Sequence, residues 1–440
     1  MKQVWIRNGL VWTGGDEPGV FAGGVLCDGD RIVAVGPDAD LEPAAHGALT
    51  IDAGGRLVVP GFINAHMHLY STFARGLSLG GSPPENFVEI LNKLWWRLDR
   101  TLTLEDLGPG AEVVLLDALR AGITTIIDHH ASNNAIDGSL DVLAGAARKL
   151  GLRLSSCYEV SDRDGPETLK AAIAENVRFA RAAESDPMLA AMFGLHASFT
   201  LSDDSLELCA AAGREAGLAF HVHVAEASPD AEDARHRGYT GALSRLHTRG
   251  LITPGSLAVH CVHTSPEEWA LVKKAGAFVV HNPQSNMNNA VGAAPVCDMI
   301  ANGVDVGIGT DGMEADVREE IRAAFLLGHH ATGDPRTMWS EIESLLAANR
   351  RIASNLFGRS LGVLAPGAAA DVVVYGYYPP TAFEPENFTG HLLFGFYRTP
   401  ASTVIVGGKV RLREGVPVDI DPAEVAARAR VQARSLWSRF

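Results

Sequence analysis

Eight short apolar segments separated by amphipathic helical segments fill the middle of this 440-residue chain and restrict its fold more than any other feature. Strands that alternate with helices are typical of a parallel sheet, and eight such units can close a barrel. Helical periodicity is clear in LEDLGPGAEVVLLDALRA before the second segment and in DSLELCAAAGREAG before the fifth. We therefore expect an α/β fold with a (β/α)₈ (TIM) barrel. Its strands are predicted in residues 57–68, 122–130, 153–160, 192–198, 219–227, 257–263, 277–283 and 305–311.

The two chain ends differ from the middle in their residue pattern. Residues 1–57 consist of short strand-like pieces broken by turn signals, and the same pattern returns in 361–376 and 402–415. The simplest interpretation is one small β-sandwich domain assembled from both ends, with the barrel inserted into it. The predicted domains are therefore 1–57 together with 365–440 for the β-sandwich, and 58–364 for the barrel.

The charge and the cysteines of the chain limit the kinds of molecule and metal site that we expect it to bind. The 37 Lys and Arg residues against 52 Asp and Glu residues give a net charge of −15, which repels nucleic acids and anionic membranes. Five single cysteines without a CxxC pair indicate neither a disulfide framework nor a thiolate zinc site. The N-terminus lacks the apolar core of a signal peptide, and no apolar run approaches the roughly 18 residues of a membrane span. We expect a soluble, cytoplasmic protein with a small-molecule substrate, and neither nucleic acid nor membrane as a partner.

Histidines are concentrated in the predicted strands. In barrel enzymes the reacting groups lie at the C-terminal ends of the strands, where the loops converge on one mouth. Ten of the sixteen histidines fall within the eight strand segments, most of them near these ends. They are His66, His68, His129, His130, His196, His221, His223, His260, His263 and His281.

Four of these strand-end side chains are predicted to bind a metal ion. His66 and His68 alternate along the first strand and so share a face, although an HxH pair alone is weak evidence. Asp311 ends the last strand, which barrel closure brings beside the first; the alternative is a turn residue before glycine. His223, near the end of the fifth strand, completes the set.

Three residues are predicted to be catalytic. Glu226 follows His223 by three residues, where a free carboxylate can take and return the proton of an activated water; the alternative is a helix-starting acid. His260, on the sixth strand, is expected to polarise the bond that breaks, and Asp311 to accept a proton. We expect His221 to pack one layer deeper and His263 to be structural.

A second group of residues is expected around the same mouth, to bind substrate or to orient a ligand. The group comprises Tyr70, Arg75, His129, His130, His196 and His281. The loop at residues 80–87 is either a lid over the site or an ordinary surface loop. Hydrolases of this kind with two metals commonly bridge the ions through a lysine on strand four, but MFGLHAS contains none. One divalent ion is therefore expected, Zn²⁺ ahead of Fe²⁺.

The motifs PGFINAHMH, HVHVAE, AVHCVH, VVHNPQSN and GIGTDG, in this order, resemble the amidohydrolase superfamily over nearly the whole chain. Within it the sequence is most similar to the branch of guanine, 8-oxoguanine and methylthioadenosine/adenosylhomocysteine deaminases and triazine hydrolases. This resemblance implies one metal ion on His66, His68, His223 and Asp311, proton transfer by Glu226, and substrate polarisation by His260. NFVEILNKLWWRLDR, DHHASNNAIDGSLDVLAG and CYEVSDRDG look like the SsnA-type aminohydrolases, which are associated with purine breakdown.

The predicted function is metal-dependent hydrolysis, most simply deamination, of a small nitrogen heterocycle related to the purines. Hydroxide would attack an sp² ring carbon while Glu226 shuttles the proton. Guanine itself is not favoured, because HMHLYSTFARG lacks the glutamine that follows the histidine pair in guanine deaminases. Ring opening of a cyclic amide is the alternative reaction, and an inactive scaffold or a metal carrier are the alternatives of another class. A homo-oligomer, dimeric or larger, is also expected.

Overall fold

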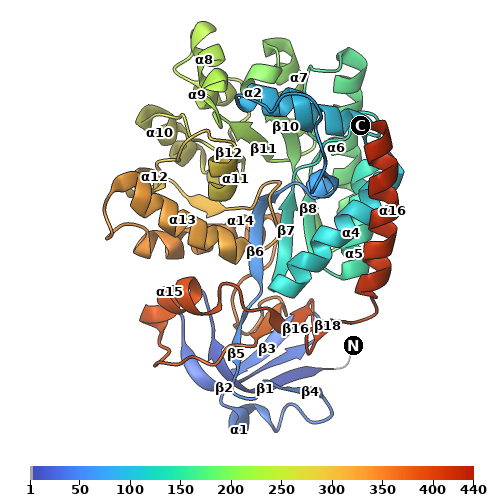
Figure 1. Ribbon diagram of the computed structural model, residues 1–440. Coiled ribbons are helices and arrows are strands. Elements are labelled where there is room, and N and C mark those ends of the chain that lie inside the picture. The colour runs from blue at the N-terminus through green and yellow to red at the C-terminus, as the bar shows by residue number, and fades with distance from the viewer. Residues whose placement is uncertain (1–2) are drawn as a thin grey trace.

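The computed structural model describes residues 3–440 and consists of a barrel surrounded by helices above a β-sheet formed by both chain ends (Figure 1). The predicted fold class is confirmed. The barrel strands are β6 (Phe62–Met67), β7 (Ile123–Asp128), β8 (Arg153–Ser156), β9 (Leu189–Ala191), β10 (Phe193–Ala197), β11 (Phe220–Val224), β12 (Leu257–His260), β13 (Phe278–His281) and β14 (Val306–Ile308).

The barrel closes through two parallel sheets, β6–β9 and β10–β14. Its fourth unit is split: β9 pairs with β8 and β10 pairs with β11, so Met192 separates two pieces. Single bridges close the two gaps, one between Val160 and Leu195 and one between Met67 and Asp311. A Cβ atom on Gly309 would lie 2.6 Å from the backbone of His66, so the second junction requires glycine there.

The chain ends form one nine-stranded sheet, in the order β18-β17-β16-β15-β5-β1-β2-β3 with β4 beside β1. Its strands are β1 (Val4–Trp12), β2 (Val20–Asp28), β3 (Arg31–Gly36), β4 (Leu49–Asp52), β5 (Leu57–Pro60), β15 (Val372–Tyr375), β16 (Ala401–Val406), β17 (Lys409–Arg413) and β18 (Val416–Pro417). Because β5 pairs with both β1 and β15, it joins the N-terminal part of the sheet to the C-terminal part.

The N-terminal boundary of the barrel lies later than the predicted residue 58. Residues 58–60 belong to β5 of the end sheet, and the chain enters the barrel only at β6. Gly61 makes this crossing against Thr124, whose side chain would lie 2.1 Å from an added Cβ atom. Apolar residues on both sides of Gly61 hide the boundary in the sequence, because both strands are buried on both faces.

The helices surround the barrel or connect the strands. They are α1 (Asp38–Leu41), α2 (Phe87–Ile90), α3 (Trp96–Thr101), α4 (Leu104–Ala121), α5 (Ser139–Leu150), α6 (Pro166–Ala183), α7 (Asp203–Glu215), α8 (Ser228–His236), α9 (Ala242–Thr248), α10 (Pro266–Ala275), α11 (Pro283–Asn288), α12 (Val296–Ala301), α13 (Val317–Thr332), α14 (Trp339–Phe357), α15 (Phe388–His391) and α16 (Pro422–Arg439). Short 3₁₀ or π turns are η1 (Leu69–Ala74), η2 (Leu91–Trp95), η3 (Ser198–Thr200), η4 (Pro385–Asn387) and η5 (Leu392–Phe396).

The predicted range 365–440 placed the C-terminal helix with the end sheet. In the structure this helix does not belong to the sheet. Figure 1 shows α16 running along the outside of the barrel beside α4. The indole of Trp437 donates to the carbonyl of Phe73 at 2.8 Å, and Gln432 donates to Asp106 at 2.7 Å. The pattern of α16 predicts a helix but does not reveal which surface its apolar face covers.

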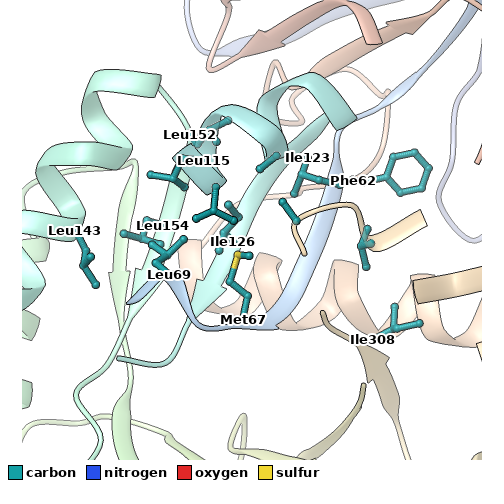
Figure 2. Close-up of a cluster of buried hydrophobic side chains, with 14 of the residues drawn as sticks. Phe62, Met67, Leu69, Leu115, Ile123, Ile126, Leu143, Leu152, Leu154 and Ile308 are labelled. Carbon is teal, nitrogen blue, oxygen red and sulfur yellow. The ribbon is translucent and has the colours of Figure 1, made fainter. Parts of the chain in front are cut away.

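A continuous apolar core fixes the strands that carry the site. Figure 2 shows side chains of β6, β7 and β8 packed against α4 and α5, among them Met67, Ile126, Leu154, Leu115 and Leu143. Burial of each such side chain contributes about 1.5 to 3 kcal/mol relative to exposure. The C-terminal ends of the strands are therefore held rigidly. Among residues 3–440, no helix is both long and apolar enough to cross a membrane.

Candidate metal centre

The four predicted metal ligands converge at the C-terminal end of the barrel. The bridge between Met67 of β6 and Asp311, three residues after β14, sets Asp311 beside the histidine pair. Its Oδ1 atom lies 3.0 Å from Nε2 of His68 and 3.7 Å from Nε2 of His66. His223 on β11 joins them, because its Nε2 atom lies 3.2 Å from Nε2 of His68. All four residues are at most 9% exposed.

The imidazoles of His68 and His223 face each other, and each donates its Nδ1 proton to a backbone carbonyl. Nδ1 of His68 lies 2.6 Å from the carbonyl of His129, and Nδ1 of His223 lies 2.9 Å from that of His196. Because a carbonyl only accepts, both Nδ1 atoms donate, so in the neutral rings both Nε2 atoms present lone pairs. Two lone pairs 3.2 Å apart repel each other unless a proton or a metal cation lies against them.

Charge also favours a cation at this position. Burial opposes protonation, but the Asp311 carboxylate raises the pKa of His68 to about 9. The Nε2 atom of His66 is buried without any hydrogen-bond partner, and burial lowers the pKa of this ring to about 4. Donor atoms of His66, His68 and Asp311 lie within 4.8 Å of one another. Imidazole nitrogens with one carboxylate are a donor set that fits Zn²⁺ or Fe²⁺.

Asp311 and the neighbouring His260 both have a strained backbone. His260 has φ of 71° and Asp311 has φ of 56°, both in the left-handed region that residues other than glycine rarely adopt. Such conformations cost about 1 to 3 kcal/mol each and persist only where the surrounding structure imposes them. Here they turn both side chains from the strand ends toward the same point.

Glu226 and His260 lie beside the ligand group. Oε2 of Glu226 is 3.5 Å from Nε2 of His260, which is itself 3.7 Å from Oδ2 of Asp311. Asn286 accepts a hydrogen bond from Nδ1 of His260 at 2.9 Å, so Nε2 is the ring atom turned toward the two carboxylates. Burial raises the pKa of Glu226, partly offset by His260. A carboxyl group with a raised pKa suits both acceptance and return of a proton near neutrality.

These residues form the floor of a cavity that opens at the mouth of the barrel. Its walls come from the segment after β6, where Phe87, Leu91, Trp95 and Trp96 face inward, and from Phe199 after β10. The predicted loop at 80–87 leads directly into α2 and η2, which cover this cavity. The aromatic walls suit a small planar ligand.

Of the six residues predicted to bind substrate, only Tyr70 and His196 line this cavity. Nδ1 of His196 is paired with the Thr200 hydroxyl at 2.8 Å, and its ring centroid lies 5.9 Å from that of Trp96. Both residues are therefore held with one face toward the cavity, as a substrate-binding role requires.

The other four are placed elsewhere, so the structure does not support direct contact with a substrate in the cavity. Arg75 points to the surface and pairs with Asp117 at 3.1 Å. His129 and His130 are completely buried, and His130 is paired with Ser132 at 2.8 Å. His281 lines a separate hollow beside α12 and α13. Strand alternation and a position near the mouth do not reveal which layer of the barrel a side chain occupies.

The two supporting histidines lie where they were predicted. Nε2 of His221 is 2.8 Å from Nδ1 of His66, one layer below the ligand group. Nε2 of His263 donates to the carbonyl of Val291 at 2.9 Å, away from the site. His221 thus orients a ligand, and His263 anchors a loop.

Several functional residues were not predicted from the sequence. The amide of Asn289 donates to Oε1 of Glu226 at 3.0 Å. Asp99 and Glu159 place two further carboxyl groups on the cavity wall. The pair Trp95-Trp96 was a detectable signal, since two adjacent tryptophans in a polar helix indicate a site. Nothing in the local pattern distinguishes Asp99 or Asn289 from solvated surface residues.

A (β/α)₈ barrel with a buried histidine-rich metal site at its mouth and a free carboxylate beside it defines a metal-dependent hydrolase. The sequence profile of the Amidohydrolase family matches residues 57–411, and the chain belongs to this family. It is a hydrolase of carbon–nitrogen bonds other than peptide bonds.

Individual relatives agree with this assignment. The chain is 32% identical to the 5-methylthioadenosine/S-adenosylhomocysteine deaminase of Desulforudis audaxviator (strain MP104C), over 99% of each chain. It is 28% identical to the 5'-deoxyadenosine deaminase of Methanosarcina mazei, over 100% of this chain and 99% of that one. A solved adenosine deaminase from Xanthomonas campestris with bound zinc has the same fold, with a TM-score of 0.85 at 23% identity over 99% of both chains.

Proposed function

We propose that this protein deaminates adenine nucleosides that carry a modified 5′ position, releasing ammonia and the matching inosine derivative. One observation carries the proposal: Glu226, His260 and Asp311 meet beside the histidine ligands at the floor of an aromatic-walled cavity. The names of the relatives, which are deaminases of 5-methylthioadenosine, S-adenosylhomocysteine and 5'-deoxyadenosine, support this substrate class.

The proposed cofactor is one Zn²⁺ ion held by His66, His68, His223 and Asp311. The bare Nε2 atoms of His68 and His223 support this ligand set, and the zinc of the X. campestris deaminase supports the choice of metal. When bound, such an ion acidifies a water molecule and polarises the carbon that is attacked. The remaining chemistry belongs to side chains of the chain.

Glu226 is the proposed proton carrier. It takes a proton from the attacking water and delivers it to N1 of the purine, so that C6 becomes tetrahedral when the water oxygen adds to it. His260 stabilises the charge that develops at C6, because its imidazole is fixed by Asn286. Asp311 accepts the second proton of the water and passes it to the amino group. The C6–N bond then breaks, ammonia leaves, and C6 becomes a carbonyl.

The cavity walls are proposed to hold the purine by its faces. Tyr70 and His196 border the ligand group, and the ring centroids of Trp96 and Phe199 lie 5.9 and 6.0 Å from that of His196. Planar aromatic walls exclude water and orient a flat ring without reading its substituents. Orientation of N1 toward Glu226 and of the amino group toward Asp311 is then left to hydrogen bonds at the floor.

The test is a panel of nucleosides and bases with the zinc-loaded protein. Ammonia release and the ultraviolet spectrum are followed for 5'-deoxyadenosine, 5-methylthioadenosine, adenosine, adenine, guanine and a hydantoin. We expect the first two to be the best substrates. Loss of the hydantoin ring without ammonia would instead establish the ring-opening reaction. Turnover of guanine ahead of every nucleoside would contradict the proposal.

Three finer assignments belong to the same proposal. The resemblance to SsnA-type aminohydrolases supports a purine-breakdown product as a further substrate to include in the panel. The five cysteines, none of which is disulfide-bonded, support a reducing, cytoplasmic location. A homo-oligomer is proposed, and light scattering after size-exclusion chromatography measures its mass directly.

A further inference from the structure

One part of the cavity wall is acidic. Five carboxyl groups line the cavity, and among residues 3–440 neither lysine nor arginine does. Asp311 belongs to the ligand group and Glu226 is the proposed proton carrier, whereas Asp230 accepts hydrogen bonds from the backbone amides of Phe199 and Ala225. The two carboxyl groups that remain, those of Asp99 and Glu159, have no role in the proposed chemistry.

The nearest cation, Arg163, lies behind these two carboxyl groups and not on the cavity surface. Its Nη1 atom donates to Oδ2 of Asp99 at 3.0 Å, and its Nη2 atom donates to Oε1 of Glu159 at 2.6 Å. Its Nε atom donates to the Ser161 hydroxyl at 3.0 Å, and its carbon Cζ lies 4.9 Å from the ring centre of Trp96. One positive charge is thus shared by two carboxyl groups and is turned away from a ligand.

Each carboxyl group has one oxygen without a hydrogen-bond partner in the protein. Asp99 is 1% exposed, and its Oδ1 atom is buried without a hydrogen-bond partner. Oε2 of Glu159 lies 3.7 Å from Nδ1 of His129, which is beyond hydrogen-bond distance. A buried acceptor without a partner is costly unless a ligand or water satisfies it. The wall therefore offers two acceptors and no free cationic donor.

The acidic wall is close to the ligand group. The His129 ring, which Glu159 faces, has its centroid 5.6 Å from that of His68. A purine placed with C6 at the ligand group would therefore direct its sugar and 5′ substituent past these carboxyl groups or toward the mouth. In a buried site, a like charge is strongly disfavoured, whereas a hydrogen-bond donor is stabilised.

We infer that the Asp99–Arg163–Glu159 cluster makes this enzyme select among adenine nucleosides by the charge of the 5′ substituent, accepting neutral and cationic groups and rejecting carboxylates. This inference rests on the proposed deamination of adenine nucleosides. It separates the activities in the names of the relatives: 5-methylthioadenosine and 5'-deoxyadenosine carry no carboxylate, whereas S-adenosylhomocysteine does. The acidic cluster is a specificity-determining group that takes no part in the proton transfers.

The test uses three 5′-thioadenosines of similar size whose sulfur carries a propyl, a 3-aminopropyl or a 2-carboxyethyl group. We expect kcat/KM for the carboxyethyl compound to be at least about tenfold below that of the propyl compound, and the aminopropyl compound to equal or exceed the propyl compound. Values within twofold of one another, or a preference for the carboxylate, would overturn the inference.

Variants test whether the Asp99–Arg163–Glu159 cluster causes the charge selection. Glu159→Gln leaves Arg163 only partly neutralised. The kcat/KM for the carboxyethyl compound should therefore rise at least about fivefold relative to that for the propyl compound. Asp99→Asn, which keeps the shape of the side chain, should act in the same direction. Glu112→Gln is the matched control, because Glu112 is 7% exposed and paired with Lys149 outside the cavity. An equal gain in the control, or no gain in either cluster variant, would contradict the assignment.

Calorimetric binding of the same three compounds separates this inference from the proposed function. If none releases ammonia but the neutral and cationic compounds still bind at least about tenfold more tightly than the carboxylate, the reaction is wrong and the charge selection stands. If all three are deaminated and bound equally well, the reaction stands and the charge selection is wrong. Failure of all three to bind would overturn both.

Discussion

Arg153 of β8 and Asp371, one residue before β15, form a completely buried two-point ion pair between the barrel and the end sheet. Nε of Arg153 donates to Oδ2 of Asp371 at 2.9 Å, and Nη2 donates to Oδ1 at 3.2 Å. The backbone amide of Gly407 donates to the same carboxylate at 2.7 Å. The two parts of the molecule are therefore joined at a point where either charge alone would be costly.

Breaking this pair should destabilise the protein strongly. Arg153→Met keeps the length of the side chain but leaves the Asp371 charge buried and unpaired, which costs about 3 to 5 kcal/mol. The double variant with Asp371→Asn should recover part of the loss, because a neutral amide needs no counterion. Arg351→Met is the control: its partner Asp305 is 51% exposed, and the expected change is within about 1 kcal/mol. Urea unfolding measures all three; equal midpoints would contradict the expectation.

Loss of the ligand carboxylate should lower metal retention. Asp311→Ala removes one of four donors, so the purified variant should hold clearly less than one ion per chain, with activity reduced in parallel. Elemental analysis of the wild-type protein should return about one zinc, the number that one ligand set permits. A reproducible value near two would contradict a site with a single ion.

The proton carrier can be separated from the ligands. Glu226→Gln preserves size and hydrogen bonding to Asn289 but cannot accept a proton. Metal content should stay near the wild-type value while kcat falls by roughly 10²-fold or more. Near-normal turnover would indicate that Asp311 carries the protons instead of Glu226.

Asn289 should affect kcat more than KM. Its amide orients the Glu226 carboxylate, and Asn289→Leu removes this hydrogen bond while roughly keeping the volume of the side chain. We expect kcat to fall by about tenfold with KM changed by less than about threefold, because positioning of a proton carrier matters most in the transition state. Metal content serves as the control. A large rise in KM at unchanged kcat would make Asn289 a substrate-binding residue instead.

Selection by substrate charge should depend on pH. Burial raises the pKa of Asp99 to about 7, while Arg163 and Arg100 oppose the rise and Glu159 adds to it. Below pH 7 the Asp99 carboxyl is mostly neutral, and above it the cavity wall becomes more negative. The ratio of kcat/KM for the propyl and carboxyethyl compounds should therefore increase from pH 6 to pH 8, and the ratio cancels titrations that affect both substrates equally. Asp99→Asn should flatten this dependence; an unchanged slope would contradict it.

The local sequence pattern was sufficient to predict the barrel and the position of the ligand group. Strands buried on both faces are recognisable as apolar runs, and a parallel barrel brings every strand end to one mouth. His66, His68 and Asp311 could therefore be assigned to one point before any coordinates were known. Sequence also marked His221 and His263 as supporting residues, since alternation along a strand specifies the face of a side chain.

Only the tertiary structure determined which polar side chains face the cavity. His129, His130 and His281 follow the same strand-end pattern as the ligands but lie in other layers or face a second hollow. Asp99 and Glu159 lie in segments that resemble those of a known family, but their local pattern singles out neither carboxyl group, and in the structure Arg163 pairs with both. Likewise, the sequence of residues 58–60 does not reveal that they pair in the end sheet, and the sequence of α16 does not reveal that this helix packs on the barrel. Periodicity encodes the direction of a side chain relative to its own strand or helix, whereas its depth and its neighbours depend on how distant segments pack together.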